Sequence, residues 1–273
     1  MTWELGLSTG IAYQHPLLDV LEPIARAGFR ALEISTAPHH FDFCDAGLVE
    51  RVRARLSSLG LRAHSLHAPF GHDVNLTSPE ADVRASSLAR LLRSADALQA
   101  LGGALFVIHP GGEDQRWIWD RAARLELSVE GLTRVWEGCR ARGLTLVVET
   151  PLPHLLGGQP DDFAFILQRI PAEGTGVCVD TSHTSLGNFL LPCLHRFGSR
   201  LVHIQASDNH GVYDDHLPPG DGRIDWPPVL GELISLDYRG VFMLEVAGNG
   251  DTVQHAASAY AAAARLFEPR PVP

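Results

Sequence analysis

The sequence predicts a single (β/α)8 TIM barrel, in which eight parallel strands close into a cylinder that outer helices surround. Two observations lead to this fold class. The chain has 273 residues, close to the roughly 250 residues typical of such barrels. β-like runs recur along the chain and alternate with amphipathic helical stretches, which is the pattern of a parallel sheet. No change in composition marks a linker, so residues 1–273 are interpreted as one domain.

Eight short runs rich in aliphatic residues are expected to be strands. They span Trp3–Ser8, Phe29–Ser35, Leu61–His67, Ala104–His109, Leu144–Glu149, Gly176–Asp180, Arg200–Gln205 and Gly240–Glu245. Seven amphipathic stretches between them are expected to be helices. They span Pro16–Ala27, Gly47–Leu59, Pro79–Leu101, Trp119–Arg142, Asp161–Ile170, Trp226–Leu236 and Asp251–Phe267. Four of these helices are followed by a glycine just before the next strand, which is a common helix end. These glycines are Gly28, Gly60, Gly102 and Gly143.

Alternation within the strands predicts which side chains face the centre of the cylinder. In Leu144–Glu149, the aliphatic Leu146 and Val148 share the outer face, whereas Val147 and Glu149 share the inner face. The strands that end at His109, Asp180 and Glu245 repeat this pattern. Each of these strands therefore brings a side chain that can bind a metal to its carboxyl end.

Two further strands carry histidines whose faces follow from the same alternation. The pattern places Leu201, His203 and Gln205 on one face and Val202 and Ile204 on the other. It also places His64 on the opposite face from His67. We expect His64 to be an ordinary core residue.

The stretch from Leu201 to Trp226 runs from an apolar strand into a polar segment rich in histidine and aspartate. Strand ends followed by many ligand-type residues are more typical of a metal site than of a solvent loop. The acidic residues of this segment are expected at the rim of the barrel. They are Asp208, Asp214, Asp215, Asp221 and Asp225.

The carboxyl ends of the strands meet at one face of a barrel, and active sites are built there. Glu149, Asp180 and Glu245 would therefore lie close together. Three carboxylates in one barrel mouth repel each other unless a cation neutralises them. The sequence thus predicts a divalent metal ion.

Composition excludes several classes of function. The chain has no lysine, so lysine-based Schiff-base chemistry, pyridoxal phosphate anchoring and the lysine phosphate loop are excluded. The net charge of −10, without a basic run, makes nucleic acid an unexpected partner. The four cysteines form no C-x-x-C pair, no apolar run is long enough for a membrane span, and the start lacks a secretion signal. We therefore expect a cytoplasmic protein.

The strand ends carry a resemblance to a known superfamily. The segments are HAPFGHDVNLTSPE at His67, FVIHPGGE at His109, VVET at Glu149, VDTSHT at Asp180 and His183, HIQASDN at Gln205, DDHLPPGDG at Asp214 and His216, and MLEVAG at Glu245. In their order and placement they resemble the xylose isomerase-like barrels. That superfamily includes sugar isomerases and epimerases, hydroxypyruvate isomerase and endonuclease IV.

The resemblance to the sugar isomerases implies one metal ion bound by Glu149, Asp180, Gln205 and Glu245. Many relatives have histidine where Gln205 stands, and His203 could substitute for it. An all-oxygen ligand set favours Mg2+ or Mn2+ over Zn2+. The resemblance further implies proton transfer next to a chelated carbonyl of a small carbohydrate. Glu149 and Glu245 would be the acid and base, and His183 a polarising group or proton donor.

Two other activities stay open at this point. Endonuclease IV binds three zinc ions, and its ligand positions resemble nine residues of this chain, of which only Gln205 differs in type. The histidines and the aspartate added by this comparison are His67, His109, Asp214 and His216. More than one ion is then expected, and abasic DNA would be the substrate, against which the net charge argues. A metal-dependent dehydratase or lyase would share the first proton-transfer step.

Weaker signals mark three residues as substrate-binding candidates. Glu33 ends the second strand, Trp117 could form an apolar wall of the pocket, and Arg223 lies in the polar segment. The sequence does not fix the oligomeric state, and a homo-oligomer is compatible with it.

Overall fold

The computed structural model describes residues 3–71, 73–113, 120–248 and 252–267. Eight parallel strands form a closed barrel in sequence order, and β1 pairs with β8 through Leu5 and Phe242. The strands are β1 (Leu5–Ser8), β2 (Ala31–Ser35), β3 (Arg62–His67), β4 (Leu105–Ile108), β5 (Thr145–Glu149), β6 (Thr175–Asp180), β7 (Leu201–Ala206) and β8 (Phe242–Leu244). The predicted (β/α)8 TIM barrel is therefore confirmed.

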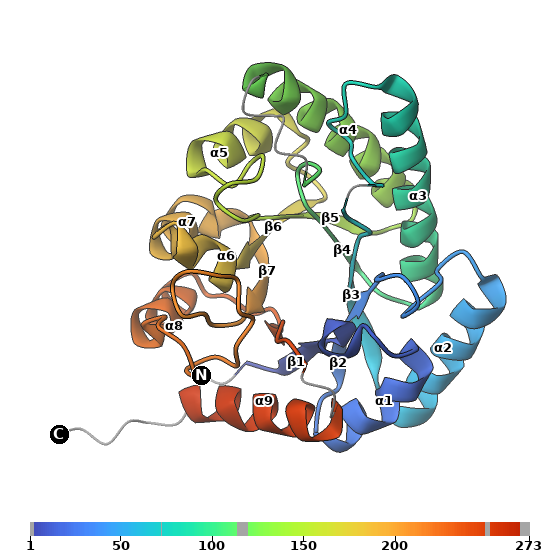
Figure 1. The fold of residues 1–273 in the computed structure, drawn as a ribbon, viewed down its shortest axis with the longest axis vertical. Coiled ribbons are helices and arrows are strands. Elements are labelled where there is room, and N and C mark those ends of the chain that lie inside the picture. The colour runs from blue at the N-terminus through green and yellow to red at the C-terminus, as the bar shows by residue number, and fades with distance from the viewer. Residues whose placement is uncertain (1–2, 72, 114–119, 249–251, 268–273) are drawn as a thin grey trace.

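Helices surround the strands as an outer ring (Figure 1). They are η1 (Thr9–Ala12), α1 (Leu17–Arg26), α2 (Ala46–Leu59), α3 (Ala81–Ala100), α4 (Arg121–Ala141), α5 (Pro160–Arg169), α6 (Thr181–Leu186), α7 (Leu190–Phe197), η3 (Gly198–Arg200), α8 (Trp226–Ser235) and α9 (Thr252–Leu266). The sequence analysis predicted α1 to α5, α8 and α9, and it missed the short helices η1, α6, α7 and η3. The four predicted helix-ending glycines all have positive φ, a conformation that costs glycine little.

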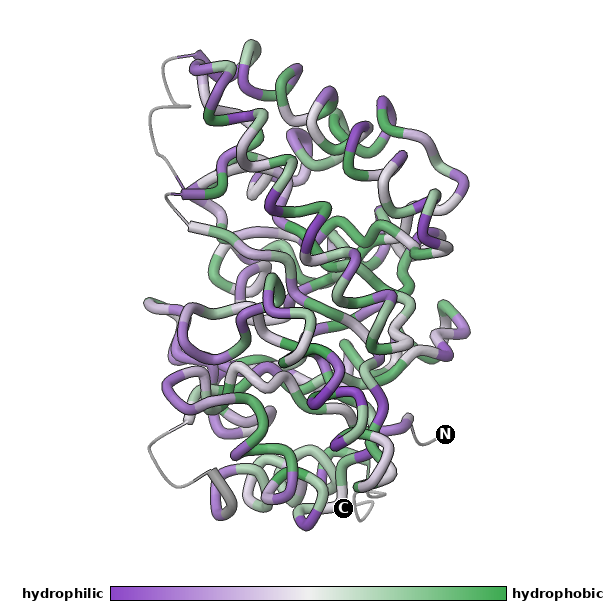
Figure 2. The backbone as a smooth tube through the Cα atoms, turned by 90° about the vertical axis from the view of Figure 1, so that its right-hand side faces the viewer, coloured by the Kyte–Doolittle hydropathy of each residue, from purple (hydrophilic) through white to green (hydrophobic). Residues whose placement is uncertain are grey.

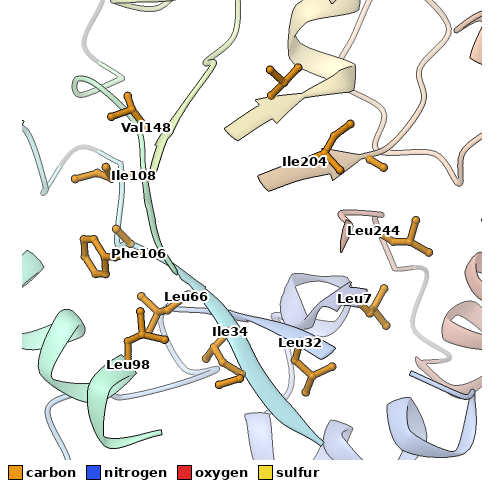
Figure 3. Packing of buried hydrophobic residues seen from close by; sticks show 14 of the residues in the cluster. Leu7, Leu32, Ile34, Leu66, Leu98, Phe106, Ile108, Val148, Ile204 and Leu244 are labelled. Carbon is orange, nitrogen blue, oxygen red and sulfur yellow. The ribbon is translucent and has the colours of Figure 1, made fainter. Parts of the chain in front are cut away.

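The main core lies between the strands and the helices. Figure 3 shows Leu66, Phe106 and Leu98, from β3, β4 and α3, gathered on the outer side of the barrel. The helices alternate between hydrophobic and hydrophilic residues along their length (Figure 2), as expected when one helix face packs on the barrel. No helix in the described part of the chain is long and apolar enough to cross a membrane.

A smaller set of apolar side chains fills the inside of the barrel. Val107, Val147 and Cys178 form a separate buried cluster there, apart from their outward neighbours. This separation confirms the predicted alternation in β4, β5 and β6. Four cysteines are free, and of these Cys44 is exposed.

The predicted alternation is wrong in two strands because each contains a register shift. In β7 the shift lies opposite Val177 and Cys178. Leu201 therefore packs on the outer core and Val202 on the interior cluster, opposite to the prediction.

The second register shift lies between β2 and β3, opposite Leu32 and Glu33. It turns His64 toward the inside of the barrel, where its ring lies 5.5 Å from the ring of the fully buried His203. His64 is therefore on the same side as His67 and not on the opposite face.

Candidate metal centre and cavity at the barrel mouth

The carboxyl ends of five strands contribute side chains to one polar cluster. His67 and Glu149 are the last residues of β3 and β5, and His109 follows β4 directly. Their side chains meet, with His67 Nε2 at 3.0 Å and His109 Nε2 at 3.1 Å from the two Glu149 oxygens. The three residues each offer one ligand atom within 4.8 Å of the others. They form a first group that could hold a metal ion.

A second group lies next to Glu149, whose Oε1 is 3.3 Å from His183 Nδ1. His183 in α6 lies with Nε2 3.1 Å from Asp214 Oδ2, and His216 Nε2 lies 2.9 Å from the same oxygen. These three residues also place ligand atoms within 4.8 Å of one another. Glu149, Asp180 and His183 form a third such group, which joins the other two.

Backbone carbonyls fix the orientation of these imidazoles. The Nδ1–H of His67 donates to the Ala68 carbonyl at 2.9 Å, and that of His216 donates to the Glu245 carbonyl at 2.9 Å. Because a carbonyl only accepts, the Nε2 of each ring is left to face the carboxylates. This is how protein histidines are commonly prepared to bind metals.

Asp180 uses its two carboxylate oxygens differently. Oδ1 caps helix α6 by accepting a hydrogen bond from the His183 backbone N–H at 2.7 Å. Oδ2 is buried and has no hydrogen-bond partner in the described chain. An unpaired buried carboxylate oxygen is costly, and a cation at this point would satisfy it. The residues therefore fit a divalent metal ion.

The electrostatics of the cluster couple its imidazoles to its carboxylates. Burial opposes the charged form of His67, but the hydrogen bond to Glu149 outweighs it and raises the His67 pKa to about 10. Burial also disfavours the charged form of His216, but the hydrogen bond to Asp214 outweighs burial and raises the His216 pKa to about 10. Protons on these rings balance the carboxylates, and a bound cation would displace them.

The carboxyl groups of the cluster differ in the direction in which their pKa values are shifted. Burial works against ionisation of Glu149, yet His109, His183 and His67 hold its pKa well below the usual value. Burial raises the pKa of Asp180 to about 6. Burial, with the negative charges of Glu149 and Asp180, raises the pKa of Glu245 to about 8.

Gln205 lies opposite Asp180 in the pairing of β6 with β7, and His203 lies opposite Cys178, earlier in the same strand. Gln205 Nε2 donates to Glu33 Oε1 at 2.8 Å, and its Oε1 accepts from the Cys178 thiol at 3.1 Å. His203 Nε2 lies 3.0 Å from Glu33 Oε2, to which Ser65 also donates. Both polar atoms of Gln205 thus have protein partners.

A cavity of about 480 Å3 opens beside the cluster. Of the predicted ligands, only His67, His216 and Glu245 line it. The remaining lining residues are Ser8, Gly10, Tyr13, Ser35, Thr36, Ala37, Pro38, Pro69, Phe70, Asp73, Arg90, Val246 and Ala247. Sequence reasoning missed most of these. Tyr13 and Ser35 could have been found from their place at or after strand ends, whereas Arg90, within α3, carries no such signal.

The weaker substrate-binding candidates do not line this cavity. Glu33 is fully buried beneath it, and its oxygens are occupied by Ser65, His203 and Gln205. Arg223 is exposed in the loop between β7 and α8. Trp117 lies outside the described residues.

The structure corrects the prediction that Asp208 lies at the acidic rim. Asp208 is fully buried. Its Oδ1 accepts from the backbone N–H groups of Asn209 and Ile224, and its Oδ2 from Gly220 N–H and Trp226 Nε1. Asp208 therefore organises the loop that carries Asp214 and His216.

Comparisons with known proteins identify the family of the barrel. A sequence model described as xylose isomerase-like TIM barrel matches residues 21–269. The chain is 26% identical over 258 residues to an uncharacterized protein of Methanocaldococcus jannaschii, covering 92% of this chain and 86% of that protein. It is 26% identical over 236 residues to D-psicose 3-epimerase of Ruminiclostridium cellulolyticum, covering 82% of this chain and 76% of that enzyme.

A solved structure of a D-tagatose 3-epimerase-like protein has a similar fold. The TM-score is 0.83 at 23% sequence identity, and the match covers 96% of this chain and 98% of that chain. Because the family model spans most of the sequence, the chain belongs to the family of xylose isomerase-like TIM barrels.

Proposed function

We propose that this protein is a metal-dependent isomerase or epimerase of small sugars that moves a proton on a carbon next to a carbonyl. One observation carries the proposal: the cavity of about 480 Å3 is lined by Glu245 together with His67 and His216. Its size is within the range of about 300–1,000 Å3 for small-molecule pockets. Relatives that are sugar epimerases support the same reaction class.

Glu245 is the proposed proton-transfer group. It follows β8 directly and is partly accessible from the cavity. A carboxylate in this position can accept a proton from a substrate carbon next to a carbonyl. In an isomerisation Glu245 would return the proton to the neighbouring carbon. In an epimerisation a second group that lines the cavity, His67 or His216, would deliver a proton to the opposite face of the same carbon.

Glu149 has a different role in this proposal, because it does not line the cavity and His67 and His109 engage both its oxygens. We assign Glu149 and Asp180 to holding the ion, together with His183 and Glu245. Such an ion supplies positive charge that stabilises the oxyanion developing on the substrate. The imidazoles of His67 and His216 line the cavity and can orient substrate hydroxyl groups.

The identity of the ion is part of the proposal. Two of the ligand groups contain two imidazoles and one carboxylate each, a set that suits Zn2+. The third group, with Glu149 and Asp180, is richer in oxygen and suits Mg2+ or Mn2+. The arrangement therefore supports more than one ion.

The test is hydrogen exchange on carbon. The protein, loaded in turn with Mg2+, Mn2+ or Zn2+, is incubated with a panel of ketoses, inositol-type ketones and hydroxypyruvate in deuterated water. NMR then reads carbon-bound deuterium and identifies epimers, isomers or dehydrated products. We expect Glu245→Gln to slow exchange by about 10²–10⁴-fold. Asp225→Asn, an exposed acid outside the cavity, is the matched control. The absence of exchange with every substrate and ion would refute the proposal.

The two histidine-rich groups favour a second candidate, hydrolysis of phosphodiesters at abasic sites in DNA. Endonuclease IV, a member of the superfamily that this chain resembles, has the same types of ligand. The net charge of −10 and the exposed Asp221 and Asp225 near the mouth oppose binding of a polyanion. Nicking of abasic-site DNA at a rate that rises with bound zinc would establish this candidate in place of the first.

A further inference from the structure

The cavity at the barrel mouth has two chemically different ends. Its inner end is formed by residues at the ends of strands, among them His67 and Glu245. Its outer end is formed by Tyr13, Phe70 and Asp73 from loops and by Arg90 from helix α3. The reaction proposed above takes place at the inner end. The outer end therefore needs a separate explanation.

Two aromatic rings at the outer end are unusually exposed. Tyr13 is 54% and Phe70 is 56% accessible, although both line the cavity. The Phe70 ring lies 5.0 Å from the His67 ring and 5.3 Å from the His109 ring. One side of Phe70 therefore packs on these two imidazoles. Exposed aromatic faces next to a polar site provide large contact surfaces with little loss of conformational freedom. They suit the flat C–H faces of a sugar ring.

Two opposite charges lie beside these rings. Arg90 and Asp73 are both exposed and line the cavity, and neither makes an ion pair or side-chain hydrogen bond within the described chain. The guanidinium offers only donors and the carboxylate only acceptors. Together they can bind hydroxyl groups, which both donate and accept. A phosphate would meet Arg90 favourably but would be repelled by Asp73 and by the acidic cluster behind it.

We propose that the outer end of the cavity binds a second, uncharged sugar unit joined to the unit that reacts, with its ring on Tyr13 and Phe70 and its hydroxyls on Arg90 and Asp73. The substrate class is then a neutral glycoside of a keto sugar and not a sugar phosphate. The volume of about 480 Å3 accommodates such a two-ring ligand. The inference rests on the proposed function for the reaction at the inner end, whereas binding at the outer end can be measured without turnover.

The test compares three probes on the full-length protein with Mg2+: D-fructose, the keto-disaccharide isomaltulose and D-fructose 6-phosphate. NMR titration gives each Kd, and saturation transfer reports which ring contacts the protein. We expect isomaltulose to bind at least about tenfold more tightly than the other two, since the second unit adds charge-assisted hydrogen bonds. Saturation should reach both of its rings.

Variants connect this preference to the outer end. Tyr13→Ala and Arg90→Gln should each lower the affinity for isomaltulose about tenfold. Arg93→Gln is the matched control, because Arg93 is exposed on the same helix but does not line the cavity. Tightest binding of D-fructose 6-phosphate, equal binding of fructose and isomaltulose, or unchanged affinity in both variants would each overturn the inference. Tight isomaltulose binding without any carbon-bound deuterium would instead count against the proposed reaction alone.

Discussion

At the scale of single residues, the carboxyl and imidazole groups of the mouth follow from a simple rule. A polar residue at the inward position of a strand end reaches the common face of the barrel, and this rule brought His67, His109, Glu149 and Asp180 together. The same rule does not foresee that Asp180 divides its oxygens between a helix cap and an unpaired position. That division depends on the short helix α6, which the sequence pattern did not indicate.

His64 gives a pH prediction at this scale. Burial, together with His203 and Arg62, lowers its pKa from 6.5 to about 4. Between these pH values the unfolded chain binds a proton that the folded protein does not, so stability falls as pH decreases through this window. We expect His64→Asn to make the decline shallower in chemical denaturation between pH 7 and 4. His210→Asn, at an exposed histidine, is the control, and equal slopes for wild type and His64→Asn would contradict the prediction.

At the scale of elements, the bulges in β3 and β7 limited what could be predicted. A shift of one residue moves a side chain to the other face of a strand, and no local feature of the sequence signals it. Leu201, Val202 and His64 were therefore assigned to the wrong faces. The pattern holds again beyond each bulge, which is why His67 and Gln205 were placed correctly inside the barrel.

The bulge in β7 depends on a glycine in its neighbour. A Cβ atom at Gly176 would lie 2.1 Å from Val202 Cγ2, closer than any real contact. We expect Gly176→Ala to lower the free energy of unfolding by about 1–3 kcal/mol, as overpacking does. Val202→Ala should restore most of this loss in the double variant, measured by urea denaturation. If the double variant loses as much stability as the two single variants added together, the clash is not the cause.

The loop between β7 and α8 was recognised from its composition, but the role of Asp208 was not. Its hydrogen-bond partners at Gly220, Ile224 and Trp226 lie far along the chain, and only the folded loop reveals them. We expect Asp208→Asn to cost about 1.5–3 kcal/mol of stability, because the amide replaces one acceptor by a donor.

The same substitution should weaken ion binding by the His183, Asp214 and His216 group, which the loop positions. Urea denaturation of Asp208→Asn measures the loss of stability, and zinc titration measures ion binding. Asp221→Asn, at an exposed acid in the same loop, is the control in both experiments. Unchanged zinc stoichiometry and affinity in Asp208→Asn would contradict the positioning role.

At the scale of the whole molecule, an ion at the mouth would join strands that are distant in sequence. The candidate ligands lie at or after the ends of β3, β4, β5, β6, β7 and β8. An ion that binds only the folded barrel stabilises it, by about 2.7 kcal/mol at a hundredfold excess over Kd. We expect Mg2+, Mn2+ or Zn2+ to raise the Tm of chelator-treated protein and Asp180→Asn to reduce this rise. A Tm that no divalent ion changes would refute the metal centre.

The closure of the ring between β1 and β8 has a consequence for biosynthesis. The strand that completes the ring begins at Phe242, so a growing polypeptide holds β1 with one side unsatisfied until β8 has been made. Exposed strand sides of this kind invite pairing with other chains. Cells that produce this protein therefore have reason to shield the emerging N-terminal half until the last strand arrives.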